Sequence, residues 1–145
     1  MAYFIVFLLL IQFVPVDRTH PPIKKEENFV EVVRTPAREK DILKQSCYDC
    51  HSFETRYPRI AYIAPVSWSI QHNISKGRVH LNFSNWSSFN KDLRTNMLKN
   101  AIRVVQEGEM PVPGYTAQHP RARLTENQRE GLVNYFKSVL EQGNY

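Results

Sequence analysis

The chain has 145 residues and a mass of 17.0 kDa, which is enough for one domain with or without a tail. Hydrophobic residues make up 42% and charged residues 23%, which excludes a disordered tail, a collagen-like repeat and a polytopic membrane protein. Two cysteines are too few for a disulfide scaffold, and a net charge of +5 without a run of five Lys or Arg does not indicate a nucleic-acid partner.

Residues 1–16 form an almost uninterrupted apolar segment, broken only by Gln12 and Pro15. A membrane-spanning helix needs about 20 apolar residues and at least roughly 17, so the segment is slightly short. It also lacks a basic n-region and an Ala-x-Ala cleavage site. We predict an uncleaved N-terminal membrane anchor, with a cleaved signal segment and a buried core segment as alternatives. The first two interpretations place the rest of the chain outside the cytoplasm.

Residues 17–34 are polar and include Pro21-Pro22 and Lys24-Lys25-Glu26-Glu27. This composition predicts a linker without a fold of its own. The remaining residues, 35–145, suffice for one compact core and are expected to form a single domain.

Helical signals dominate the first half of that domain. Pro36 suits the start of a helix over residues 37–45. Two prolines and several aromatic residues predict a loop over 57–69, which leads into a short helix over about 66–76. We expect that helix to end at Gly77, which is a natural residue just after a helix.

Helical signals also occur in the second half of the domain. Apolar residues recur at helical spacing from Leu93 to Val105, and Gly108 stops the pattern. Two prolines and a glycine in residues 110–114 predict a loop. Thr125 and Gln128 form a capping box for a last helix. Its expected buried face comprises Leu132, Val133, Phe136, Val139 and Leu140. No alternating strand pattern occurs, so we predict an all-α domain with long loops.

One motif carries chemistry: Cys47-Tyr48-Asp49-Cys50-His51. C-x-x-C-H is the attachment sequence of haem c. Two thiols on one helical turn can each add across a haem vinyl group, and the imidazole of His51 then projects toward the iron as the proximal ligand. We therefore expect one covalently attached haem c. The apolar N-terminal segment agrees, because haem is attached on the export side of the membrane.

Three other functions of a C-x-x-C pair fit this sequence less well. A thioredoxin-like redox pair needs a preceding strand in a βαβ unit, and here a helix is predicted. A zinc site needs four ligands, but none of the remaining histidines has H-x₃₋₅-H spacing. A disulfide between Cys47 and Cys50 would close too small a loop to stabilise much.

The distal iron ligand is expected to be Met110, which lies in a Pro-bounded loop between two helices. His/Met ligation raises the haem potential relative to harder ligand pairs. The alternatives for the distal position are His80, His72, His119 or no protein ligand. Met110 could also serve only as an apolar packing residue. Met97 falls on the apolar face of its helix and is expected to be core.

A few further residues are candidates for the cofactor's surroundings. Arg78 could pair with a haem propionate, although a solvated surface position is the simpler expectation. Five aromatic residues could wall a flat macrocycle, but ordinary packing is the simpler expectation for each: Trp68, Trp86, Tyr57, Tyr62 and Tyr115.

Over about Pro36 to Phe136 the chain resembles a bacterial family of small c-type haem-binding domains. The matching pieces are Cys47 to Ser52, Ile63 to Trp68, Gly77-Arg78, Leu81 to Trp86, Gly108 to Pro111, Tyr115, His119-Pro120 and Ala122 to Leu124, besides Gln12-Phe13 and Pro21-Pro22. The segment Arg56 to Ile60 departs from the family, which usually has a Trp-Pro-Trp-Tyr-like cluster there. Its two arginines could alter the haem edge or a partner surface.

The resemblance implies a cytochrome c-like helical fold on the periplasmic side of the bacterial inner membrane, often tethered to it. It also implies that Cys47 and Cys50 hold the haem, that His51 is the proximal ligand and that Met110 matches the distal position. We expect a monohaem carrier that passes single electrons to a redox partner. The basic net charge of the chain favours an acidic partner. A domain that binds or senses CO, NO or O₂ is the alternative, and a peroxidase-like enzyme is a weaker one.

Overall fold

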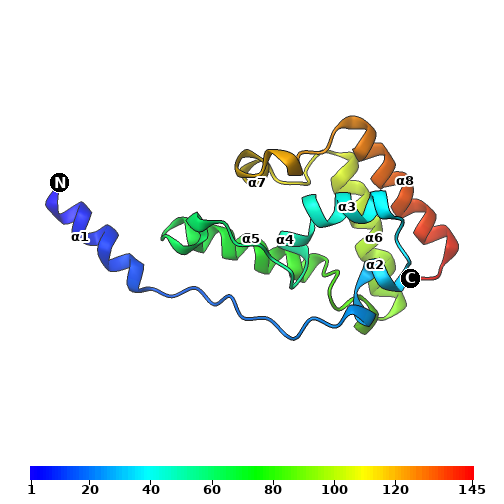
Figure 1. Ribbon diagram of the computed structural model, residues 1–145, viewed down its shortest axis with the longest axis horizontal. Coiled ribbons are helices and arrows are strands. Elements are labelled where there is room, and N and C mark those ends of the chain that lie inside the picture. Colours follow the sequence, from blue (N-terminus) through cyan, green and yellow to red (C-terminus); the bar gives the residue numbers. More distant parts are fainter.

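The computed structural model describes all residues from Met1 to Tyr145 and contains helices and no strand, which confirms the predicted all-α class (Figure 1). The helices are α1 (Ala2–Leu10), α2 (Phe29–Val32), α3 (Ala37–Ser46), α4 (Tyr48–His51), α5 (Val66–His80), α6 (Lys91–Gln106), α7 (Pro113–Gln118) and α8 (Glu126–Gln142). Short 3-10 turns occur at η1 (Ile11–Phe13), η2 (Lys25–Glu27), η3 (Arg59–Tyr62), η4 (Trp86–Ser88) and η5 (Pro120–Ala122).

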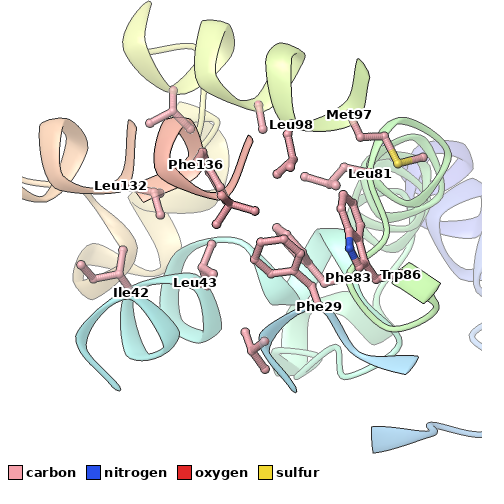
Figure 2. Close-up of a cluster of buried hydrophobic side chains, with 14 of the residues drawn as sticks. Phe29, Ile42, Leu43, Leu81, Phe83, Trp86, Met97, Leu98, Leu132 and Phe136 are labelled. Carbon is pink, nitrogen blue, oxygen red and sulfur yellow. The ribbon is translucent and has the colours of Figure 1, made fainter. Parts of the chain in front are cut away.

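One core of buried side chains holds α2, α3, α4, α6 and α8 together (Figure 2). Phe29 and Trp86 are both fully buried there, and their rings meet edge to face with centroids 5.0 Å apart. This T-shaped arrangement suits the quadrupoles of two aromatic rings. The core therefore links the start of the domain to the segment between α5 and α6.

Side-chain caps start the two longest helices. The side chain of Asn90 accepts a hydrogen bond from the Leu93 backbone N–H at the start of α6. The Thr125–Gln128 capping box is fully formed at the start of α8, as predicted. Most of the predicted buried face of α8 is also confirmed, because Leu132, Val133, Phe136 and Val139 are buried and only Leu140 is partly exposed.

Two helix boundaries differ from the sequence-based expectation. Gly77 does not end α5, which continues to His80, because Gly77 is a buried helical position that packs against Cys50. Residues 110–114 are not loop throughout, because α7 begins at Pro113. A proline at the first position of a helix loses no hydrogen bond, since that N–H has no partner within the helix.

The predicted linker is shorter than expected. Asn28, Phe29 and Val30 are buried, and α2 forms over Phe29–Val32. The Asn28 side chain caps α2 by accepting from the Val30 backbone N–H. The end of the 17–34 segment is thus part of the folded domain, because it supplies Phe29 to the main core.

Helix α1 projects away from the rest of the molecule, while Gln12 just after it hydrogen-bonds to Ala64 (Figure 1). α1 has nine residues, and none of its side chains is buried. No helix of the protein combines the length and the apolar character needed to cross a bilayer, so the structure gives no support to the predicted membrane-spanning anchor. The alternative of a buried core segment is not observed either, because Ile11 is the only buried residue before Asn28.

Candidate functional site

The five-residue cysteine–histidine motif forms a tight helical turn after α3. The chain bends at Cys47, whose φ of −124° separates α3 from α4. The Cys47 carbonyl then accepts from the backbone N–H groups of Cys50 at 3.2 Å and His51 at 2.9 Å. Both cysteines are unpaired and half-buried. The motif thus presents two free thiols and an imidazole within one turn.

Tyr48 anchors this turn to the core. Its ring is buried and stacks on Phe83, with centroids 5.0 Å apart and planes 6° from parallel. Its hydroxyl donates to Asn28 Oδ1 at 2.7 Å, and its backbone carbonyl accepts from Ser52 Oγ at 2.7 Å. These contacts fix the motif on a rigid element, which a cofactor site requires.

Asp49, the other residue between the cysteines, ties two loops to the motif. Its buried carboxylate accepts from the backbone N–H of Arg56 at 3.0 Å and from Arg56 Nε at 3.2 Å. It also accepts from the hydroxyl of Tyr115 on α7 at 2.8 Å. Charge-assisted hydrogen bonds of this kind are stronger than neutral ones. Asp49 therefore joins the segment after the motif and the segment after Met110.

His51 has the geometry of a neutral metal ligand. Its Nδ1 lies 3.0 Å from the Leu81 carbonyl oxygen, and burial lowers the pKa of its imidazole. A neutral ring that donates from Nδ1 leaves the Nε2 lone pair for a metal, and such outer hydrogen bonds orient ligating histidines in metalloproteins. His51 could therefore offer Nε2 to a metal while Nδ1 stays on the Leu81 carbonyl.

Burial also keeps the two thiols protonated. It raises the pKa of Cys47 to about 12, and it raises that of Cys50 to about 11. A reactive thiolate instead needs a lowered pKa in an electropositive setting. No strand precedes the motif, and no group of three His, Cys, Asp or Glu side chains could hold a metal ion. The thioredoxin-like and zinc alternatives therefore find no support.

α5 crosses the motif at very short range because residue 77 is a glycine. A Cβ built on Gly77 would lie 2.7 Å from the Cys50 carbonyl oxygen and 3.3 Å from the Cys50 Cβ. No side chain fits at that separation without moving one of the two backbones. Gly77 is therefore what allows α5 to lie against the Cys50 turn.

The motif opens into a cavity with a volume of about 590 Å³. This volume falls within the roughly 300–1,000 Å³ of small-molecule and cofactor sites. Cys47, Cys50, His51 and Met110 all line it. The apolar part of the wall includes Leu81, Phe83, Met97, Ala101, Val104, Val105, Val112, Leu124 and Phe136. An apolar cavity that two thiols and a neutral imidazole reach fits an iron porphyrin.

Met110 comes to the cavity on a turn stabilised by backbone contacts. Gly108 adopts a positive φ of 75° just after α6, which glycine tolerates best. The Met110 backbone N–H donates to the Val104 carbonyl at 3.1 Å, and its carbonyl accepts from Arg129 Nη1 at 3.4 Å. The structure thus brings Met110 and His51 to the same cavity. Met97 is buried in the core, as expected, and also lines the cavity.

The alternative distal histidines lie in different places. His80 lines the same cavity, although its side chain is largely exposed. His119 stacks on Tyr115 and lines two other pockets. His72 is exposed and lines none of the three principal pockets. Of the three, only His80 shares the cavity with His51.

The residues proposed as cofactor surroundings are placed elsewhere. None of the five aromatic candidates lines the cavity beside the motif. Trp86 is in the core, and Trp68 and Tyr62 are exposed. Tyr57 and Tyr115 line a smaller pocket. Arg78 also points to other partners, because its Nε donates to the Ser52 carbonyl at 2.8 Å and its Nη2 to Thr55 Oγ1 at 3.1 Å. Arg78 therefore stabilises the loop after the motif.

Sequence reasoning missed the polar residues of the cavity wall. Asn73 and Lys76 of α5 line it together with Asn100 and Arg103 of α6, beside His80, which was already a candidate ligand. Their spacing carried a usable signal, because residues three or four apart share one face of a helix. Lys76 and Arg103 place two cations beside a mostly apolar cavity, although Arg103 also pairs with Glu107 and Glu109. This setting suits a ligand with both an apolar body and carboxylates.

Comparison with known proteins gives one match. A family model described as a haem-binding domain matches residues 6–138, which is nearly the whole chain. No curated protein and no solved structure matches the sequence.

Proposed function

The chain belongs to the haem-binding domain family, and from that premise we propose that it is a monohaem c-type cytochrome that transfers single electrons. The observation that carries this proposal is the cavity of about 590 Å³, whose wall contains Cys47, Cys50, His51 and Met110. A cytochrome c-like arrangement of this all-α domain, with one covalent haem c, is part of the proposal.

Each residue has a defined part in holding the cofactor. Cys47 and Cys50 would form the two thioether bonds, and His51 would bind the iron through Nε2 while its Nδ1 stays on the Leu81 carbonyl. Met110 would supply the distal thioether. Lys76 and Arg103 would pair with the propionates, because both line the same cavity. When bound, the haem supplies one-electron oxidation and reduction of its iron.

An iron held by both His51 and Met110 would have no open position, and this would favour electron transfer over ligand chemistry. Small-ligand binding or sensing is the alternative, and it requires Met110 to leave or to be absent from the iron. His80 lines the same cavity, so exchange of the distal ligand is a specific route to that alternative. The position of Met110 on a backbone-bonded turn supports the first class.

We also propose that the protein acts on the periplasmic side of the bacterial inner membrane with redox partners that are exported or membrane-bound. The support is the apolar N-terminal segment and the need to attach haem c outside the cytoplasm. The net charge of +5 favours an acidic partner protein, since opposite charge speeds encounter at low salt.

The test compares two methionine variants of the exported holoprotein. Met97→Leu removes a buried core thioether, and Met110→Ala removes the proposed ligand. We expect only Met110→Ala to lose the weak far-red ferric band of thioether coordination and to bind CO at once when reduced. Axial ligands set haem potentials over a range of about 0.8 V, so Met110→Ala should also lower the potential.

Three results would contradict the ligand assignment. Immediate CO binding by the unaltered protein would favour the sensing alternative. An unchanged ferric spectrum in Met110→Ala would remove Met110 from the iron. Loss of the band in Met97→Leu would assign the distal position to Met97 instead.

A further inference from the structure

The end of the molecule where α5 begins carries a group of exposed apolar side chains, which we call the apolar corner. Its members come from η1 and η3, from the residue after each, and from the first turn of α5. Their exposed fractions range from 37% to 83%: Phe13, Val14, Ile60, Tyr62, Ile63 and Trp68. This corner lies beside the base of α1, at the opposite end of the molecule from α8 (Figure 1). Exposed apolar surface this concentrated indicates an interaction site.

The composition of α1 indicates which kind of surrounding covers the apolar corner. Its sequence, AYFIVFLLL, is apolar around the whole helix, and every residue except Leu8 is exposed. A groove on a protein covers one face of a helix and leaves the opposite face in water. A helix that is apolar on all sides needs an apolar surrounding on all sides, which hydrocarbon chains provide.

The base of α1 is fastened to the corner by a pair of hydrogen bonds. Gln12 Nε2 donates to the Ala64 carbonyl at 3.1 Å, and the Ala64 backbone N–H donates to Gln12 Oε1 at 2.9 Å. Ile11 is buried next to this pair, although it is not part of the main core. Such a two-point contact fixes both the distance and the direction of the joint between α1 and the corner.

Cations and aromatic side chains lie at the same place. The Arg18 guanidinium lies 4.5 Å from the Tyr62 ring centroid and 5.6 Å from that of Tyr57, and it also donates to the Ala61 carbonyl. Arg59 is exposed on η3. Tyr and Trp are enriched where a bilayer meets water, and Arg is attracted to anionic lipid headgroups there.

We propose that the apolar corner is a seat on a lipid membrane: α1 enters the hydrocarbon layer while Ile60, Tyr62 and Trp68 lie among the headgroups. The nine residues of α1 rise about 14 Å, which is about half of the roughly 30 Å hydrocarbon core. The Gln12–Ala64 contact makes α1 and the domain one oriented unit, so α1 is not a free tether. This inference does not depend on haem ligation.

The seat has a consequence for the cavity. α5 begins at the corner with Val66 and reaches the cavity with Asn73, Lys76 and Gly77. Gly77 lies about 16 Å along the helix from Val66 at the usual rise per residue. A seated corner would therefore hold the cavity at a fixed distance from the lipid.

The test uses the full-length holoprotein and vesicles of phosphatidylethanolamine and phosphatidylglycerol. We expect the protein to float with the vesicles, and we expect backbone amides of residues 59–68 to exchange hydrogen more slowly when vesicles are present. Ile60→Ser should weaken vesicle binding about two- to eightfold, because it removes an apolar side chain from the seat. Leu93→Ser is the matched control: Leu93 is 41% exposed on α6 and Ile60 is 39% exposed, and the control should bind as the unaltered chain does.

Two further variants separate the parts of the proposal. Arg59→Gln should weaken binding about fivefold on these anionic vesicles and leave binding to phosphatidylcholine vesicles unchanged. Gln12→Ala should still float through α1, but residues 59–68 should lose most of their protection because the joint is broken. These readouts do not use the haem, so they stand whether or not Met110 binds iron.

Several outcomes would overturn the seat. Flotation without any slowing of exchange at residues 59–68 would show that α1 is a tether and that the corner stays in water. Equal loss of vesicle binding in Ile60→Ser and Leu93→Ser would remove the corner's role. Protection that appears without vesicles and grows with protein concentration would assign the corner to contact between copies of this chain.

Discussion

Replacing Gly77 with alanine tests whether α5 must touch the backbone of the haem-attachment turn. Alanine is the better helix former by about 0.8–1.0 kcal/mol, so helix propensity alone predicts a gain in stability. Against this, the new Cβ would lie 2.7 Å from the Cys50 carbonyl oxygen and 3.2 Å from the Cys50 carbonyl carbon. Both are backbone atoms that cannot rotate away.

The magnitude follows from these two effects. Overpacking a tight contact costs about 1–3 kcal/mol, which exceeds the gain in helix propensity. We expect Gly77→Ala to lower the free energy of unfolding by up to about 2 kcal/mol. At about 2–4 °C per kcal/mol, Tm should fall by up to about 8 °C. It should also reduce the fraction of chains that carry haem, because α5 and the Cys50 turn must separate.

Gly131→Ala is the matched control. Gly131 also lies inside a helix, α8, but a Cβ there meets nothing within 4 Å. That substitution should raise the free energy of unfolding by about 0.8–1.0 kcal/mol. Urea unfolding followed by far-ultraviolet circular dichroism measures both variants. If Gly77→Ala stabilises the protein as Gly131→Ala does, the close approach of α5 to Cys50 is refuted.

Three further changes test other contacts. Tyr115→Phe removes the hydrogen bond to the Asp49 carboxylate and should lower the free energy of unfolding by about 1.5–3 kcal/mol. Backbone amides of α7 should then exchange hydrogen faster. Unchanged exchange there would show that the bond does not hold α7. Thr125→Ala breaks the capping box of α8 and should cost about 1 kcal/mol in urea unfolding, and a neutral effect would contradict the cap. Burial raises the pKa of Tyr135 to about 12 from its ordinary 10.0, so this tyrosine stabilises the fold below pH 10 and loses that contribution as the pH rises toward 12. The stability difference between the unaltered chain and Tyr135→Phe should therefore shrink over that range in urea unfolding at several pH values, and a constant difference would refute the shift.

The helices that sequence reasoning predicted best are those fixed by local chemistry. Thr125 and Gln128 satisfy each other within one turn, so the start of α8 could be identified without tertiary information. The apolar period from Leu93 to Val105 likewise predicted α6. In both cases the decisive contacts lie within a few residues of each other in the chain.

The elements that it predicted less well depend on distant contacts. Gly77 was expected to end a helix, but its lack of a side chain serves contact with Cys50, a residue on another element. Phe29 was assigned to a linker because the 17–34 segment is polar as a whole, yet it packs against Trp86 far along the chain. Local composition does not show either partner.

The residues of the candidate site also divide into those that local sequence identified and those that depend on distant contacts. The spacing of Cys47, Cys50 and His51 named the thiols and the imidazole directly, because all three share one turn. Met110 was inferred from its Pro-bounded loop, and the structure brings it to the same cavity. Lys76 and Arg103 were not anticipated, since they come to the same cavity only in the folded chain.

The most direct test of haem attachment is the intact mass of the exported, mature protein after denaturation, together with its Soret absorbance. We predict a mass equal to the polypeptide plus one haem, and loss of that added mass when Cys47 and Cys50 are both changed to alanine. A denatured chain with the mass of the polypeptide alone and no Soret absorbance would contradict covalent attachment, and so would retention of the added mass in the double variant.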